Sequence, residues 1–229
     1  KIREDFPVLA RKLNGLPLVY FDNAATTQKP QVTINALVEY YQQYNANIHR
    51  GLHTLAEEAT AAYEQTRDFI KTILNAEYRE EIIFTGGTTD GINLVSSVLS
   101  KAYLKAGDEI IISGMEHHSN IVPWQMACEL TGSVLKIIPV TDDGRLDMNA
   151  YHNMLSEKVK VVSVVYVSNA LGTINPVAEI VQAAKKVGAL TLIDGAQSTA
   201  HFDIDVQAIG CDFYTFSGHK LYGPTGVGV

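Results

Sequence analysis

The sequence is poor in the features that mark secreted, membrane-spanning and disulfide-bonded proteins. Two cysteines in 229 residues do not make a disulfide framework, and nothing in the chain resembles a secretory signal. No apolar run reaches the roughly 18 residues that a membrane-spanning helix needs. These absences predict a cytoplasmic protein in a reducing compartment, with no membrane partner.

Positive charge is also scarce. Lysine and arginine number 18 against 25 aspartates and glutamates, which gives a net charge of −7, and no basic block occurs. Nucleic acid is therefore not expected as a partner. With 46% apolar and 19% charged residues, the chain is expected to be globular and long enough for one large α/β domain.

Common ligand-binding motifs are missing as well. The chain has neither GxxxxGK[ST] nor GxGxxG, the glycine-rich patterns of nucleotide sites. His117 and His118 are adjacent, but no cysteine or carboxylate lies at a zinc-ligand spacing such as CxxC or HExxH. We predict no metal site.

The apolar segments alternate between strand-like and helix-like patterns. Strands are expected near 82–84, 109–112, 134–138, 161–166, 190–193 and 212–216. Helices are expected over Val32–Tyr44, Glu57–Leu74, Thr89–Lys105, Ile121–Thr131, Asp147–Leu155 and Pro176–Val187. This alternation predicts an α/β fold, a mostly parallel sheet with helices on both faces. Residues 1 to about 20 are expected to form an arm, with a short helix or turn at Asp5–Leu9.

A lysine follows the last predicted strand, in the run Ser217-Gly218-His219-Lys220. Flanked by a hydroxyl and an imidazole, it suits a Schiff-base lysine, whose pKa must fall for the amine to become nucleophilic. Ser217 and His219 would then hold an anion such as a phosphate. The alternative is a solvated surface lysine, and this run alone does not decide between the two.

An acid ends another predicted strand. Asp194 follows the apolar run Thr191–Ile193, and Gln197 comes shortly after it. The carboxyl ends of parallel strands are where α/β sheets bind ligands. A carboxylate there can pair with a pyridinium nitrogen and keep it protonated, as pyridoxal-phosphate chemistry requires. The alternative is that Asp194 only caps the next turn.

Two further segments connect strands to helices. The run Gly86-Gly87-Thr88-Thr89 precedes a predicted helix, whose free N–H groups and dipole favour an anion such as a phosphate. Alternatively Thr88 or Thr89 is the helix N-cap, and both roles can hold at once. His117, after the strand at 109–112, could stack on a flat aromatic ring or move a proton.

In the order GGTT, EHHSN, DGAQ and SGHK, these segments resemble the pyridoxal-phosphate enzymes of the aminotransferase class V family. Within it, the chain is similar to cysteine desulfurases of the SUF-system type, which are themselves similar to selenocysteine lyases. Further matching segments are FDNAAT at 21–26, HRGLHTL at 49–55, VSNALG at 167–172 and FSGHKLYGPTG at 216–226. The resemblance covers the whole chain and implies the large domain of the pyridoxal-phosphate-dependent transferase fold type I.

The resemblance implies a role for each candidate residue in binding pyridoxal 5′-phosphate. Lys220 would form the Schiff base and later move the proton at the substrate Cα, while His117 would stack on the ring and serve in catalysis. Asp194 would pair with the pyridine nitrogen, and Gln197 with the phenolic oxygen. The implied phosphate ligands are Thr88, Thr89, Ser217 and His219, and the implied substrate-binding residues are Asn169, Ala24 and His49.

The implied reaction takes sulfur from L-cysteine, or selenium from L-selenocysteine, and leaves alanine and an enzyme persulfide for iron–sulfur cluster assembly or other sulfur delivery. The implied partners are a second copy of the chain, contacted by the segment 49–55, and a protein sulfur acceptor of the SUF type. The alternatives are another class V enzyme, such as a selenocysteine lyase, an epimerase, a kynureninase-like hydrolase or an aminotransferase, and a cofactor-free scaffold for sulfur trafficking.

The resemblance also implies parts that this sequence does not contain. The family's sulfur-accepting cysteine, its carboxylate-binding arginine and its small C-terminal domain lie beyond Val229, and the chain begins with Lys1. We therefore expect residues 1–229 to be the cofactor-binding large domain of a longer protein, without desulfurase turnover of its own. Cys128 and Cys211 are expected to be core residues. The family's antiparallel strand would begin at Gly226–Val229.

Overall fold

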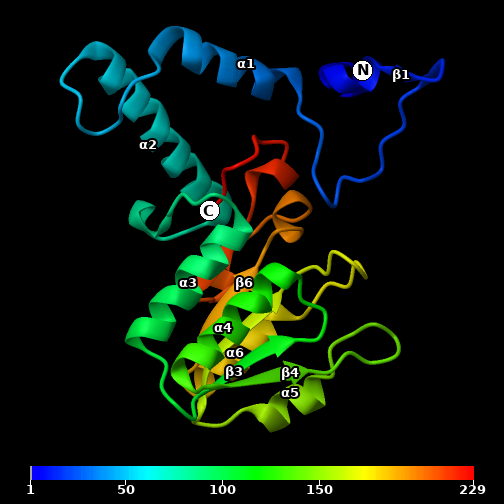
Figure 1. Cartoon of the computed structure of the whole chain (residues 1–229), viewed down its shortest axis with the longest axis vertical. Coiled ribbons are helices and arrows are strands. Elements are labelled where there is room, and N and C mark those ends of the chain that lie inside the picture. Colours follow the sequence, from blue (N-terminus) through cyan, green and yellow to red (C-terminus); the bar gives the residue numbers. More distant parts are fainter. Residues whose placement is uncertain (1) are drawn as a thin grey trace.

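The computed structural model describes residues 2–229 and is built around one five-stranded sheet (Figure 1). The strands lie in the order β4-β3-β5-β6-β7, and every neighbouring pair is parallel. They are β3 (Glu109–Ser113), β4 (Val134–Ile138), β5 (Val159–Val165), β6 (Leu190–Asp194) and β7 (Phe213–Thr215). The predicted parallel sheet is confirmed, and its central strand β5 is buried along nearly its whole length.

Helices cover both faces of the sheet, because successive side chains of a strand point to opposite sides. On β3, Ile110 and Ile112 pack with residues of α3 (Thr88–Ala102) and α4 (Val122–Thr131). Ile111, between them, belongs to the opposite cluster, with residues of α5 (Met148–Met154) and α6 (Val177–Lys186). The predicted arrangement of helices on both faces is confirmed.

Figure 1 shows α1 (Gln31–Glu39) and α2 (Thr54–Leu74) at one end of the molecule, beyond the sheet. α1 continues into a π-helical turn, Tyr40–Tyr44. α2 begins earlier than the predicted Glu57, because the His53 ring caps it and accepts a hydrogen bond from Ala56 N at 3.3 Å. Histidine is not among the residues that usually mark a helix start, so this earlier start could not be predicted from the sequence pattern. No helix within residues 2–229 combines the length and the apolarity of a bilayer span.

The N-terminal arm holds a small hairpin that the sequence prediction missed. Two 3-10 helices, Ile2–Asp5 and Pro7–Ala10, precede the antiparallel pair β1 (Lys12–Leu13) and β2 (Leu16–Pro17). Asn14 and Gly15 form the turn with φ angles of 54° and 82°. Positive φ at both central residues favours Asn-Gly, so this dipeptide was the available sequence signal. The remaining elements are α7 (Val206–Ile209) and the 3-10 helices Arg79–Glu81, His118–Asn120, Ser198–Ala200 and Gly218–Lys220.

The predicted strand at 82–84 is wrong, and the predicted antiparallel strand at Gly226–Val229 forms only isolated pairings. Gly228 makes single antiparallel bridges to Thr85 and to Ser217. A β-ladder needs several consecutive paired residues. Next to the segment 82–84, Thr85 is the one residue that pairs with Gly228. The antiparallel direction is as predicted, and the close approach requires glycine because a Cβ at Gly228 would collide with Gly87.

Candidate active site

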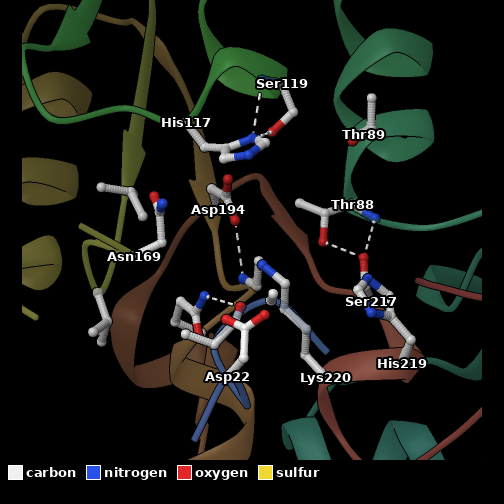
Figure 2. Close-up of a pocket in the computed structure, with 16 residues that line it drawn as sticks. Asp22, Thr88, Thr89, His117, Ser119, Asn169, Asp194, Ser217, His219 and Lys220 are labelled. Atoms are coloured by element: carbon white, nitrogen blue, oxygen red, sulfur yellow. Dashed lines mark hydrogen bonds between the residues drawn. The ribbon is translucent and has the colours of Figure 1, made fainter. Parts of the chain in front are cut away.

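A cavity of about 470 Å³ opens at the carboxyl end of the sheet (Figure 2). All but one of the predicted site residues line this cavity. The lining residues among them are Ala24, Thr88, Thr89, His117, Asn169, Asp194, Gln197, Ser217, His219 and Lys220. They come from the loops after β3, β5, β6 and β7, from the start of α3 and from the N-terminal segment. Parallel strands explain this convergence, because their carboxyl ends share one edge of the sheet.

The start of α3 and the loop after β7 form an anion cradle. Gly87, with φ of 141°, is the N-cap of α3 and gives no side-chain cap. The backbone N and the hydroxyl oxygen of Thr88 each lie 2.8 Å from Ser217 Oγ. The alternative of Thr88 or Thr89 as the N-cap is wrong, because both lie within α3. Thr88, Thr89 and Ser217 line the cavity beside the N-terminus of α3, where an anion can bind.

Asp194 lies at the centre of this cavity, with His117 and Lys220 on either side of it in Figure 2. Its side chain is 1% exposed, and Oδ1 accepts a hydrogen bond from Ala196 N at 2.9 Å. Burial raises the pKa of Asp194, while the Ala196 hydrogen bond and the charges of Lys220 and His117 lower it. The Asp194 carboxylate therefore caps the turn that follows β6, as the alternative predicted. It also lines the cavity, where it can bind a ligand.

Lys220 is half-buried in the cavity and is not a solvated surface lysine. Desolvation by burial lowers the pKa of Lys220, and the charge of Asp194 raises it. A lower pKa increases the share of neutral amine, which is the nucleophilic form. The chain therefore places one nucleophile beside one buried carboxylate.

His117 is held in one ring orientation by Ser119, a residue that the sequence analysis did not single out. The Ser119 backbone N donates to His117 Nδ1 at 3.2 Å, and Ser119 Oγ lies 2.8 Å from the same nitrogen. Because Nδ1 accepts the backbone hydrogen bond, the neutral ring carries its proton on Nε2. Asn120 N also donates to the His117 carbonyl at 2.8 Å, which fixes the backbone there.

Glu116, which precedes His117 in the sequence, is a partly buried acid that was not predicted as a site residue. Its carboxylate accepts hydrogen bonds from Asn120 Nδ2 at 2.7 Å and Val165 N at 2.9 Å, and it forms a very short hydrogen bond with Ser113 Oγ. Burial is the main cause that raises the pKa of Glu116 to about 7, and the charge of Asp194 adds to it. Glu116 lies three residues after the end of β3, and an acid so near the carboxyl end of a buried strand was the available sequence signal.

Replacing Glu116 by glutamine should flatten the pH dependence of stability in the cofactor-free protein. A raised carboxylate pKa means that the folded state binds more protons than the unfolded state above pH 4.5, so stability falls as the pH rises toward about 7. The loss amounts to about 3 kcal/mol across that window. Urea unfolding at several pH values measures it.

The glutamine variant should also be less stable than the parent near pH 5, because its amide group faces Asn120 Nδ2, a second donor. Glu129→Gln, on the exposed side of α4, is the matched control and should keep the parental slope. A Glu116→Gln protein with the parental slope would contradict the assignment of the raised pKa to this group.

The N-terminal segment closes one side of the cavity. Gln197 Nε2 donates to the Ala24 carbonyl at 2.8 Å, and Asp22 and Ala25 also line the cavity. The predicted contact of Gln197 with a phenolic oxygen and that of Asn169 and Ala24 with substrate stay predictions. Their presence in the cavity makes these contacts possible for a ligand bound there.

His49 is the predicted site residue that lies outside the cavity. Its Nε2 is 2.9 Å from Glu64 Oε1, and its ring packs edge-on against Tyr63 with centroids 5.4 Å apart. The segment around His49 lies between α1 and α2, the elements beyond the sheet, so this chain does not carry it to its own cavity.

The two cysteines lie away from the cavity, as predicted. Cys128 and Cys211 are both partly buried and free, and each packs against a core cluster. Burial raises the pKa of Cys211 to about 12, so its thiol is a poor nucleophile at neutral pH. Cys211 precedes β7, while Lys220 follows it, which puts them beyond opposite ends of that strand.

The residues present fit pyridoxal 5′-phosphate. The cradle at Thr88 and Ser217 suits its phosphate, and Lys220 suits its aldehyde. The buried carboxylate of Asp194 suits a protonated ring nitrogen, because such a cation would offset the cost of its burial. No group of three or more His, Cys, Asp or Glu side chains within residues 2–229 is placed to hold a metal ion.

The sequence profile of the aminotransferase class V family matches residues 19–229, and the chain belongs to that family. Its fold is the pyridoxal-phosphate-dependent fold type I. The predicted family and fold class are therefore confirmed.

The chain is similar over its whole length to curated proteins of bacteria. It is 52% identical to a cysteine desulfurase of Synechococcus elongatus and covers 37% of that protein. It is 52% identical to a cysteine desulfurase of an Enterobacter species and 53% identical to a probable cysteine desulfurase of Halalkalibacterium halodurans, and it covers 56% of each. The chain thus spans about half the length, or less, of these relatives.

Solved structures show the same likeness. The apo cysteine desulfurase of Thermococcus onnurineus is 39% identical, with a TM-score of 0.92, and the alignment covers 99% of this chain and 55% of that one. The structure of a protein called SspA in complex with cysteine is 28% identical, with a TM-score of 0.85, and the alignment covers 92% of this chain and 60% of that one.

Proposed function

We propose that this chain is the cofactor-binding large domain of a pyridoxal-phosphate-dependent cysteine desulfurase. The observation that carries the proposal is the joint placement of Lys220, Asp194 and His117 in one cavity beside an anion cradle. Relatives named cysteine desulfurase at 52 to 53% identity support it, as does the similar structure in complex with cysteine. L-cysteine is accordingly the proposed substrate, with L-selenocysteine as a second possibility for the same chemistry.

The proposed roles follow from the chemistry of each side chain. Thr88, Thr89, Ser217 and His219 hold the phosphate with the first turn of α3. Asp194 would pair with the pyridine nitrogen and favour its protonated form. His117 would stack on the ring, with the Nε2 proton of its neutral form available. When bound, pyridoxal 5′-phosphate supplies an electron sink for negative charge at the substrate Cα.

Lys220 is proposed to act twice. Its neutral amine would hold the cofactor covalently, and burial favours that neutral form. With substrate bound, the same amine would be the base that takes the Cα proton. Asn169 and Gln197, which also line the cavity, would orient the substrate and the ring by hydrogen bonds.

Full-length protein should show absorbance of covalently bound cofactor and should form alanine from L-cysteine. Borohydride reduction followed by peptide mapping should place the cofactor on Lys220. A colourless protein that stays colourless with added pyridoxal 5′-phosphate, or reduction at another lysine, would refute the proposal. Comparing L-cysteine with L-selenocysteine then decides the preferred substrate.

We also propose a cytoplasmic homodimer that passes sulfur to a protein acceptor of the SUF type, for iron–sulfur cluster assembly. His49 supports the dimer, because it lies in a segment between α1 and α2 that does not reach the cavity of its own chain. In a dimer this segment would approach the neighbouring subunit's cavity, where His49 would bind substrate. Light scattering on the full-length protein tests this proposal, and an active monomer would rule it out.

A further inference from the structure

The carbonyl of His219, which belongs to the peptide bond that leads into Lys220, is held by the N-terminal segment. Lys29 Nζ donates to this oxygen at 2.8 Å, and Thr27 donates to it from its backbone N and its hydroxyl, each at 3.0 Å. Thr26 Oγ1 lies 3.2 Å from the same oxygen. A carbonyl oxygen has two lone pairs, so these donors occupy it fully, and the charged donor makes the strongest contact.

The same segment also fixes the residues just after Lys220. Tyr222 has a φ of 62°, a conformation that is strained for a residue other than glycine. Its N–H donates to Thr27 Oγ1 at 2.9 Å, and its carbonyl accepts from Thr33 Oγ1 at 3.1 Å. Such strain persists only where surrounding contacts hold it. The backbone is therefore held on both sides of Lys220 by residues nearly 190 positions earlier in the sequence.

Lys29 itself does not line the cavity, so its ammonium acts on the backbone and not on a ligand. It is partly buried, and Thr27, at 6% exposed, is buried beneath it. Lysine has a long and flexible side chain, and the position that its amine can reach depends on the backbone that carries it. A tilt of the peptide bond between His219 and Lys220 would move the amine relative to Asp194.

We propose that Lys29 is a positioning residue, whose ammonium clamps the His219 carbonyl and thereby aims the amine of Lys220 at the aldehyde of the cofactor. This inference rests on the proposed function, in which Lys220 attaches pyridoxal 5′-phosphate. It assigns a role to a lysine outside the cavity, on a segment remote in sequence from every strand of the sheet.

Cofactor attachment in full-length, cofactor-free protein tests the clamp. Lys29→Met should slow the appearance of the absorbance band after mixing with pyridoxal 5′-phosphate by about tenfold or more, the effect of one lost charge-assisted hydrogen bond. Lys29→Arg keeps a charged donor and should restore most of the rate. Pyridoxamine 5′-phosphate has the same ring and phosphate but no aldehyde, so its dissociation constant should change by less than about threefold, because it needs no contact with an aimed amine.

Lys12→Met is the matched control, because it removes the same charge from an exposed position of the N-terminal arm and leaves the His219 carbonyl untouched. Its attachment rate should stay near that of the parent. If Lys29→Met does not fold by circular dichroism, Lys29→Gln replaces it and should slow attachment several-fold, since it removes the charge and keeps a polar group.

Parental attachment rates in Lys29→Met or Lys29→Gln would overturn the clamp. So would an equal loss in Lys12→Met, or a matching loss of pyridoxamine 5′-phosphate binding, which would place the effect in the phosphate cradle. Failure of the parent itself to attach cofactor at Lys220 would overturn the proposed function, and the clamp with it. The parent reaction therefore separates the two failures.

Discussion

Replacing Lys220 by alanine should remove covalent attachment of pyridoxal 5′-phosphate and lower alanine formation from L-cysteine by about 10⁴-fold, since the variant loses both a nucleophile and a general base. Lys220 lines the cavity beside Asp194, and burial there lowers its pKa. The measurements are the absorbance band of the attached cofactor, borohydride trapping and the rate of alanine formation in the full-length protein.

Two further variants separate nucleophilicity from charge. Lys220→Arg keeps the positive charge beside Asp194, but a guanidinium is not deprotonated in proteins, so it should be as inactive as alanine. Lys186→Ala, on the exposed side of α6, should leave attachment and turnover unchanged. An active Lys220→Arg protein would show that the position supplies only charge.

The sheet and most of the site could be predicted from the sequence because both rest on local patterns. The apolar run at 161–167 predicted a strand covered on both faces, and β5 is buried as expected, although it begins and ends two residues earlier. Asp194 ends a strand and Lys220 and His117 follow one, and parallel strands bring such residues to one edge of the sheet. Their placement at strand ends therefore supported the prediction of one shared cavity.

What the sequence did not predict depends on contacts between distant segments. The segment at 82–84 has a strand-like pattern, but a strand forms only where a neighbouring segment pairs with it. On this side Gly228 pairs with Thr85 alone, the residue that follows the segment. The clamp of Lys29 on His219 joins residues 190 positions apart, a relation that no periodicity reports. Glu116 was not predicted because its raised pKa depends on its surroundings in the fold, which no local pattern reports.

Replacing Asp194 by asparagine should have two opposite effects. In the loaded protein, exchange of the substrate Cα proton with solvent deuterium should fall by about 10²-fold or more, since an amide can hydrogen-bond the ring nitrogen but cannot stabilise its positive charge. Cofactor should still attach, because Lys220 and the anion cradle at Thr88 and Ser217 remain. Near-normal exchange would refute the role of Asp194.

In the cofactor-free protein, the same substitution should increase stability at neutral pH. Burial raises the pKa of Asp194 above its ordinary value of 3.8. Between that value and the raised pKa, the folded state binds more protons than the unfolded state, so stability falls as the pH rises from 3.8 toward the raised pKa. At neutral pH the raised pKa of Asp194 therefore lowers the stability of the folded state, and the neutral amide removes this cost. The urea midpoint of Asp194→Asn should therefore exceed that of the parent at pH 7, and the two midpoints should converge near pH 4.

Asp212→Asn is the matched control for both effects. Asp212 lies at the amino end of β7, where Oδ2 accepts hydrogen bonds from the Thr191 N–H and hydroxyl, each at 2.8 Å. That carboxylate is partnered within the chain, and an amide oxygen can replace it, so Cα exchange should not fall and stability should not rise. A gain in stability at Asp194 but not at Asp212 would mean that the chain keeps a costly buried charge only where the cofactor's cation binds, a cost retained at a functional site.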